Sequence, residues 1–283
     1  MVDVAAAQAP AALEIRIQGK RVTVDRRGFD VLGRIDVDVA SREIVVVVGG
    51  SGAGKTSLLR AIAGLDKAFD GEIRTLGRPI HGPGRDRGMV FQEHRLMPWM
   101  TVAQNVAYAL PSRQPADRVR GLVAHALALV GLTGFHEAWP NQLSGGMAQR
   151  ASLARALVTT PEILLLDEPL GALDSLLRSQ MQTELERIIL AEQLTAMMVT
   201  HDVDEAVRLA DRVLVMAGPP GRVVAEVPIP LPRPREVADP QLQDFRTRIL
   251  AILHQGVAIG DLLVHPDAHR RALPVDHASG EGG

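Results

Sequence analysis

The sequence predicts an α/β protein built around a mainly parallel sheet. Three apolar runs, residues 44–48, 163–166 and 196–199, have the length and composition of strands buried on both faces. The first run passes into a glycine-rich loop and then into a short helical segment. The second ends at two carboxylates, and the third leads to a histidine. In a parallel sheet these polar strand ends would gather at one edge.

Two regions around this core have a different pattern. Residues 13–17, 21–24 and 35–39 alternate apolar and polar side chains, which predicts three half-buried antiparallel strands in a small N-terminal β-layer. Residues 93–158 contain no convincing strand and show helical spacing instead, most clearly over residues 116–130. We therefore expect a helical subdomain inserted into the α/β core.

The expected domain organisation follows from these patterns. Residues 1–12 are alanine-rich and are expected to be disordered. Residues 13–255 should form one domain, with its helical subdomain at about 93–158. Residues 256–283 should form a loose C-terminal tail, since the sequence becomes polar and ends in glycines.

Composition excludes several classes of function. The chain has 283 residues and a formal net charge of -2, so no global basic field supports a nucleic-acid partner. It has no cysteine, which excludes a disulfide scaffold, a thiolate nucleophile and a cysteine-held metal. No apolar run approaches the roughly 18 residues needed to span a bilayer, and the N-terminus does not have the pattern of a signal peptide. We expect a cytoplasmic protein.

The loop after the first buried run is the most informative motif. Its eight residues are Gly49, Gly50, Ser51, Gly52, Ala53, Gly54, Lys55 and Thr56. Glycines let successive N–H groups face an anion, and the following helix adds the positive end of its dipole. Lys55 is expected to reach the β- and γ-phosphates, and the Thr56 hydroxyl to ligate Mg²⁺. A flexible turn with an unrelated lysine would not explain the flanking strand and helix. The loop predicts a P-loop NTPase core that binds a nucleoside triphosphate.

Two carboxylates end the second buried run. If its strand is parallel to the P-loop strand, Asp167 and Glu168 face the same edge as the phosphates. Asp167 would then hold the Mg²⁺ shell, and Glu168 could accept a proton from the attacking water. The alternative is a solvated acidic turn before Pro169, which four preceding apolar residues make unattractive.

A second candidate anion site opens a helix at residues 143–147, with Ser144, Gly145 and Gly146 at its start. This segment resembles the signature motif of the ABC-transporter ATPase subunits, with Met147 where glutamine is more usual. The resemblance covers nearly all of residues 13–227, because further motifs of that family follow in order. They are the P-loop, the Q-loop glutamine Gln92, the Walker B pair Asp167 and Glu168, the D-loop at residues 171–174, and the switch histidine His201.

The resemblance implies a composite catalytic site. Two copies would pair head to tail around two ATP molecules, with Ser144, Gly145 and Gly146 of one copy closing over the γ-phosphate in the other's P-loop. Gln92 would sense Mg²⁺ and the γ-phosphate, Glu168 would be the general base, and His201 would steady the γ-phosphate. The implied cofactors are ATP and Mg²⁺, with Thr56, Gln92 and Asp167 around the metal.

One position departs from the family pattern. The family usually places an aromatic residue that stacks on adenine a few residues before the position of Val31, where this chain has residues 25–28 instead. The nearest aromatic residue is Phe29. Either Phe29 takes this role or an arginine lies on the base through its guanidinium plane.

Softer matches resemble the branch of the family that imports nitrate, sulfonate and taurine. They lie at residues 82–92, 96–99, 179–182, 218–223 and 233–235. The branch implies a homodimer at the cytoplasmic face of the bacterial inner membrane, bound to integral-membrane permease subunits and served indirectly by a solute-binding protein. The segment 96–99 would suit a groove for the permease, although core packing explains it equally well. The transported solute is not encoded in this chain.

Two other functions remain open at this point. A non-transport ABC ATPase that acts on nucleic acid or ribosomes usually has tandem cassettes or a long coiled coil, and this sequence has neither. A P-loop kinase that phosphorylates a small molecule would leave the signature helix unexplained. ATP hydrolysis coupled to transport is the leading hypothesis.

Overall fold

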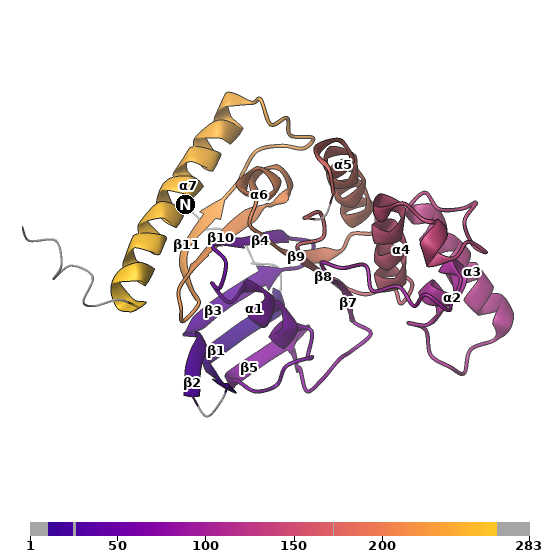
Figure 1. The fold of residues 1–283 in the computed structure, drawn as a ribbon, viewed down its shortest axis with the longest axis horizontal. Coiled ribbons are helices and arrows are strands. Elements are labelled where there is room, and N and C mark those ends of the chain that lie inside the picture. The colour runs from indigo at the N-terminus through magenta and orange to yellow at the C-terminus, as the bar shows by residue number, and fades with distance from the viewer. Residues whose placement is uncertain (1–10, 25–26, 172, 265–283) are drawn as a thin grey trace, which may run out of the picture.

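The computed structural model describes residues 11–24, 27–171 and 173–264. Its central layer is a six-stranded sheet in the order β11-β10-β4-β9-β8-β7 (Figure 1). The strands are β4 (Ile44–Gly49), β7 (Arg87–Val90), β8 (Ile163–Asp167), β9 (Thr195–Thr200), β10 (Arg212–Ala217) and β11 (Arg222–Pro228). All neighbours pair in parallel except β10 and β11, which form an antiparallel hairpin. The predicted mainly parallel α/β core is confirmed.

Both faces of this sheet are covered, which explains the continuous apolar runs. Along β4, Val45 and Val47 face one hydrophobic cluster while Val46 and Val48 face another. The first cluster lies between the sheet, α1 (Lys55–Ile62) and the N-terminal strands. The second lies beneath helices on the opposite face. These helices are α4 (Gly145–Leu157), α5 (Ser175–Ala191), α6 (Val203–Leu209) and α7 (Pro240–Val264).

The N-terminal layer is antiparallel as predicted, but its strands differ from the expected ones. Its members are β1 (Ala11–Val24), β2 (Arg27–Leu32), β3 (Ile35–Ala40), β5 (Asp70–Thr75) and β6 (Arg78–Pro79). The two strands expected over residues 13–24 are one long strand, β1, which pairs first with β3 and β5 and then with β2. Lys20 sits in the middle of β1 and is buried, with its ammonium 2.6 Å from Asp66. Because Asp66 pairs with it, Lys20 can be buried within β1, at a position that the sequence analysis left between two predicted strands.

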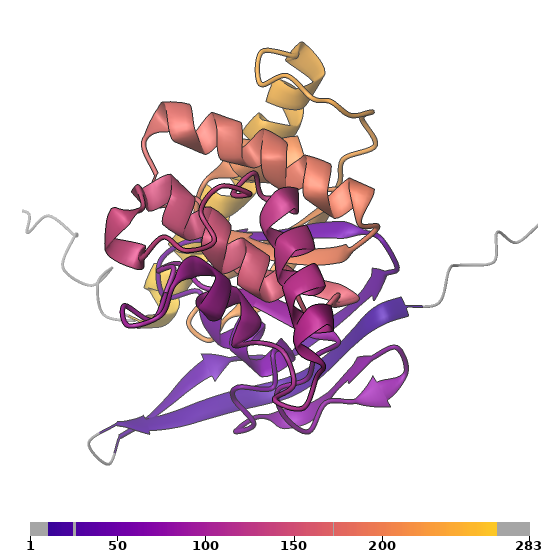
Figure 2. The same ribbon diagram turned by 90° about the vertical axis from the view of Figure 1, so that its right-hand side faces the viewer.

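Residues 93–158 lie at one end of the molecule and contain only helices among their assigned elements (Figures 1 and 2). These are α2 (Val102–Ala107), α3 (Ala116–Leu129), a 3-10 turn at Pro140–Gln142, and α4. Thr101 begins α2 through a capping box with Gln104. Both α2 and α3 pack on α4, which also contacts β7 and so joins the helical region to the sheet.

The ends of the chain depart from the expected domain limits. Ala11 and Ala12, expected in a disordered N-terminus, begin β1. Helix α7 continues through Val264, so residues 256–264 are helical rather than the start of a loose tail. The expected disorder of residues 1–10 and the looseness of residues 265–283 concern positions outside the described residues.

Residues 229–239 cross from β11 to α7 and are fixed by a buried arginine. Only 6% of Arg235 is exposed, and its guanidinium donates hydrogen bonds to five backbone carbonyl groups. The acceptors are the carbonyl oxygens of Val207, Arg208, Ala210, Ile229 and Leu231. Arg235 therefore joins the end of α6 to the segment that leads into α7.

Gly121 in α3 gives a prediction about stability. Gly121→Ala should raise the free energy of unfolding by about 0.5–1 kcal/mol, because alanine favours the helix and costs less backbone entropy on folding. A Cβ at Gly121 meets no atom within 4 Å. Gly131→Ala should instead lower stability, since Gly131 has φ +69°. Urea unfolding of both variants tests the pair; an equal effect of both substitutions would contradict it.

Candidate functional site

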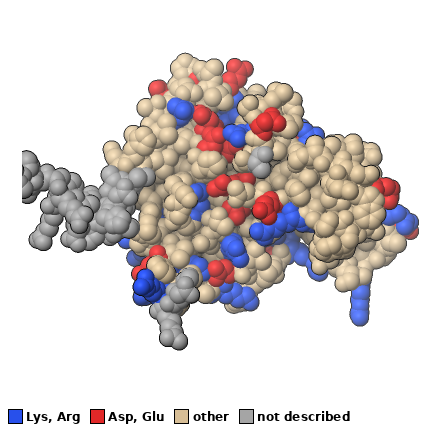
Figure 3. All heavy atoms as spheres, viewed as in Figure 1, with Lys and Arg blue, Asp and Glu red and all other residues tan. Residues whose placement is uncertain are grey.

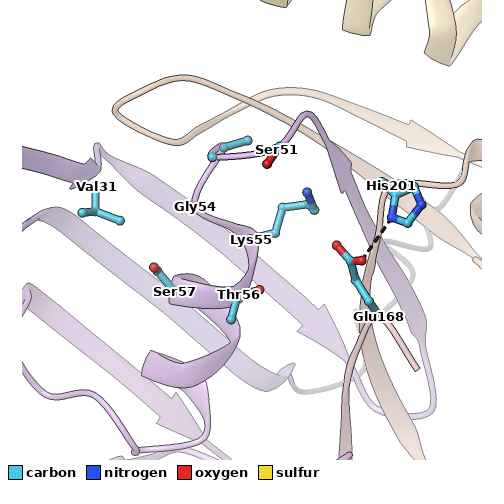
Figure 4. Close-up of a pocket in the computed structure, with 10 residues that line it drawn as sticks. Val31, Ser51, Gly54, Lys55, Thr56, Ser57, Glu168 and His201 are labelled. Atoms are coloured by element: carbon cyan, nitrogen blue, oxygen red, sulfur yellow. Dashed lines mark hydrogen bonds and ion pairs between the residues drawn. The ribbon is translucent and has the colours of Figure 1, made fainter. Parts of the chain in front are cut away.

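A pocket of about 440 Å³ lies where the P-loop meets the carboxyl ends of β8 and β9 (Figure 4). It is lined by Val31, Ser51, Gly52, Ala53, Gly54, Lys55, Thr56, Ser57, Glu168 and His201. In Figure 4 the P-loop residues occupy one side and Glu168 and His201 the other. The parallel arrangement of β4, β8 and β9 thus brings distant motifs to one opening.

The P-loop backbone has the form needed for binding an anion. Gly52 and Gly54 have φ of +79° and +85°, and Gly54 is the residue that starts α1. Lys55 follows and is buried, with its ammonium donating to the carbonyl oxygens of Gly49 (2.8 Å) and Gly50 (3.0 Å). Burial lowers the pKa of Lys55, while Glu168 and Asp167 oppose that change. The loop therefore combines a helix N-terminus with a cation beside it.

Asp167 lies under the P-loop helix rather than at a solvated turn. The Thr56 hydroxyl donates a 2.9 Å hydrogen bond to Asp167 Oδ1. Burial raises the pKa of this carboxyl, which is only 8% exposed, and the Thr56 hydrogen bond opposes the rise. The solvated-turn alternative for Asp167 is therefore wrong.

Glu168 and His201 face one another across the ends of β8 and β9 (Figure 4). His201 Nδ1 is 3.1 Å from Glu168 Oε2. The Glu168 backbone has φ +43° and its N–H donates to the carbonyl of Val199. An uncommon backbone conformation for a glutamate is thus held by the neighbouring strand, and it directs the side chain into the pocket.

Gln92 and the signature residues Ser144, Gly145 and Gly146 are not among the residues that line this pocket. Gln92 follows β7, is exposed, and does not line the pocket. Ser144 begins α4 and accepts a 3.3 Å hydrogen bond from the Met147 N–H. Ser144 and Gly145 are exposed, whereas Gly146 is buried. One chain therefore brings together the P-loop, the carboxylates and the histidine, but not the signature residues.

The residues on the side of the pocket expected to receive adenine were only partly predicted from the sequence. Val31, at the end of β2, lines the pocket, although sequence reasoning used it only as a landmark. Phe29 lies on the same strand, is 52% exposed, and is not among the lining residues. Of the two arginines in the alternative, Arg26 falls outside the described residues, and Arg27 is exposed on β2 and is not among the lining residues. The adenine contact stays a prediction.

The donors near the P-loop suit Mg²⁺ bound together with phosphate. Among the described residues, no group of three or more His, Cys, Asp or Glu side chains could hold a metal ion. Thr56 and the buried Asp167 offer adjacent hard oxygen donors. Mg²⁺ is usually held by one or two protein oxygens plus phosphate and water, so this small donor set fits it.

Charge on the surface is mixed. Figure 3 shows acidic and basic side chains interspersed over the middle of this face and fewer over the helical end. Exposed aromatic residues occur in the helical region, including Trp99 (70%) and Tyr108 (62%). No helix within the described ranges is long and apolar enough to cross a membrane.

Comparison with known proteins places the chain in a family. The family model described as ABC transporter matches residues 32–171. The aliphatic sulfonates import ATP-binding protein SsuB of Bacillus licheniformis is 44% identical over 239 residues, covering 84% of this chain and 93% of that protein. The chain belongs to the ATP-binding subunits of ABC transporters.

Further relatives agree with this assignment of the cassette. SsuB 2 of Burkholderia cenocepacia is 44% identical over 242 residues, covering 86% of the cassette and 87% of that protein. A solved dimer of the ATP-binding cassette MJ0796, in a post-hydrolysis state with ADP and Pi, matches with a TM-score of 0.68 and 28% identity. It covers 77% of this chain and 98% of that one. The predicted ABC ATPase is confirmed, and nothing in these relatives favours the nucleic-acid alternative.

Proposed function

We propose that the cassette hydrolyses ATP to power a bacterial importer of aliphatic sulfonates or related small solutes such as nitrate or taurine. The placement of Glu168 beside His201, opposite the P-loop, is the observation that carries the hydrolytic role. The sulfonate assignment rests on the relatives, which are named as aliphatic sulfonates import ATP-binding proteins, and on the branch-like segments of the sequence.

The pocket suggests how the cassette's own residues act on ATP. Loop N–H groups and Lys55 bind the phosphates, and the Lys55 ammonium exchanges its two backbone carbonyls for phosphate oxygens. Water attacks the γ-phosphorus and loses a proton to Glu168, while the bond to the bridging β–γ oxygen breaks. His201 orients Glu168 and steadies the γ-phosphate.

The metal site completes this proposal. Thr56, Asp167 and Gln92 would hold Mg²⁺, which neutralises phosphate charge when bound. Thr56 and Asp167 are already in contact, whereas Gln92 is exposed at the end of β7. Gln92 therefore joins the metal site only when nucleotide is bound and the end of β7 approaches it.

A second copy would supply the missing signature. Ser144, Gly145 and Gly146 lie away from their own chain's pocket but begin a helix, as an anion-binding segment should. The structurally similar cassette MJ0796 is described as dimeric. We infer a head-to-tail homodimer at the cytoplasmic membrane face, with permease subunits docked on the helical region at 93–158 and a solute-binding protein acting through them. Exposed Trp99 is a candidate contact for the permease.

Mixing two inactive variants tests the shared site. Lys55→Ala disables the P-loop, and Ser144→Arg disables the signature, so each homodimer should hydrolyse little ATP. In a mixed dimer, the intact P-loop of one chain meets the intact signature of the other. An equimolar mixture should recover roughly a quarter of the wild-type rate, because half of random dimers are mixed and each has one of two sites intact. Phosphate release measures the rate.

The control for mixing combines Lys55→Ala with a chain carrying both substitutions. This mixture contains no intact P-loop and should stay inactive. Equal recovery in both mixtures, or none in the first mixture despite proven subunit exchange, would show that the signature does not act across the dimer.

A further inference from the structure

The turn at residues 218–221 joins β10 to β11, which pair as an antiparallel hairpin. Because β10 lies next to β4 in the sheet, this turn lies beside the P-loop that follows β4 (Figure 1). No residue of the turn lines the nucleotide pocket. Its contacts instead reach the back of the P-loop and the end of β2.

Gly221 is tied to β2 by two backbone hydrogen bonds. Its N–H donates to the carbonyl of Val31 at 2.9 Å, and its carbonyl accepts from the N–H of Gly33 at 2.9 Å. Leu32 and Gly221 form an isolated parallel bridge between these bonds. The turn is therefore held at the strand end that carries Val31, a pocket-lining residue.

Gly221 also presses directly on the P-loop. A Cβ built on Gly221 would lie 2.2 Å from the carbonyl oxygen of Ala53, far inside contact distance. Gly221 is buried and is not among the glycines with positive φ. Only the close approach to Ala53, and not an unusual backbone angle, requires glycine at this position.

Two further glycines show that three segments pack closely here: the P-loop, the end of β2 and the β10–β11 hairpin. A Cβ on Gly49 would lie 2.5 Å from the carbonyl oxygen of Met216, at the end of β10. A Cβ on Gly54 would lie 2.6 Å from Leu32 Cδ2 and 3.0 Å from the carbonyl oxygen of Val31. The end of β2, the P-loop and the end of the β10–β11 hairpin therefore approach one another more closely than side chains would allow.

The contact at Ala53 has a direct consequence for phosphate binding. In a trans peptide, the carbonyl of Ala53 and the N–H of Gly54 point in opposite directions. Since the Ala53 oxygen faces Gly221, the Gly54 N–H points away from the turn, and Gly54 itself lines the pocket. The turn thus fixes the direction of one of the N–H donors available to a phosphate.

We propose that Gly221 is a positioning residue for nucleotide binding, which acts by orienting the Ala53–Gly54 peptide from outside the pocket. This inference rests on the proposed ATP site. Nothing larger than glycine fits between the turn and the P-loop, so a side chain at this position displaces a phosphate donor that it never touches.

The test compares two glycines at which an added Cβ would clash with a backbone carbonyl oxygen. Gly221→Ala should raise the Kd for MgATP at least about tenfold, because small displacements of positioned groups are costly. Gly88→Ala is the matched control: its Cβ would lie 2.6 Å from the Ala156 carbonyl oxygen, away from the nucleotide pocket. Both should lower the thermal midpoint, but only Gly221→Ala should weaken binding measured by titration calorimetry on folded protein. Equal Kd values for the two variants would overturn the proposal.

A second measurement uses the unaltered chain and so does not depend on a variant that folds. MgATP should slow hydrogen exchange at the amides of Gly221 and Gly33, in addition to slowing it in the P-loop. Protection confined to residues 49–57 would count against the proposal. Failure of the wild-type chain to bind MgATP would instead remove the proposed function itself, so the two failures are distinguishable.

Discussion

Glu168→Gln is expected to lower the rate of ATP hydrolysis at least about 100-fold while leaving ATP binding intact. Loss of a positioned general base typically costs two to four orders of magnitude. Glutamine keeps the shape of the side chain and can still reach His201, now 3.1 Å from the carboxylate, but it cannot take a proton from water. The phosphate-binding loop is untouched by the substitution.

The measurement pairs phosphate release with nucleotide binding. Glu162→Gln makes the same chemical change at an exposed position just before β8 and should leave both unchanged. With ATP and Mg²⁺, Glu168→Gln should also accumulate as a dimer in light scattering. The two copies stay paired around ATP because the variant no longer hydrolyses it. A wild-type rate in this variant would remove Glu168 from the catalytic role.

Arg235→Met is expected to lower the free energy of unfolding by about 3–5 kcal/mol, a cost typical of breaking a buried hydrogen-bonded charge network. Methionine fills much of the same space but leaves the carbonyl groups that Arg235 now satisfies without a donor. The carbonyl groups that lose their hydrogen bonds lie at the end of α6 and in the segment leading into α7.

Chemical denaturation gives this number, with Arg248→Met as the matched control. Arg248 lies exposed on α7, so its replacement should change stability by no more than about 0.5 kcal/mol. Similar midpoints for the two variants would mean that the carbonyls around Arg235 find water instead. ATP hydrolysis of the folded Arg235 variant should remain, because Arg235 does not line the pocket.

Much of the core could be predicted because its strands are buried on both faces. The run at 44–48 is apolar throughout since alternate residues face different clusters. The N-terminal layer was harder to predict. Lys20 fell between two predicted strands, yet it is buried within β1 beside Asp66. Strand β2 was not predicted because Arg27, Phe29 and Asp30 are exposed.

The site followed the same division. The P-loop and the carboxylates were foreseen because one local stretch of sequence specifies a strand, a loop and a helix. The contact between Glu168 and His201 depends on β8 and β9 being neighbours, and the Gly221 contact depends on β10 lying beside β4. Local patterns carry no information on such pairings, and the adenine contact remains unassigned for the same reason.

The hairpin that supports the P-loop also ends the sheet. As the outermost strand, β11 exposes Arg222 and Glu226 and finishes at Pro228, which has no N–H to offer. Charge and proline on an edge strand discourage another strand from adding to it. Self-association by continuing the sheet from one molecule into the next, the usual route to β-aggregation, is therefore disfavoured at this edge.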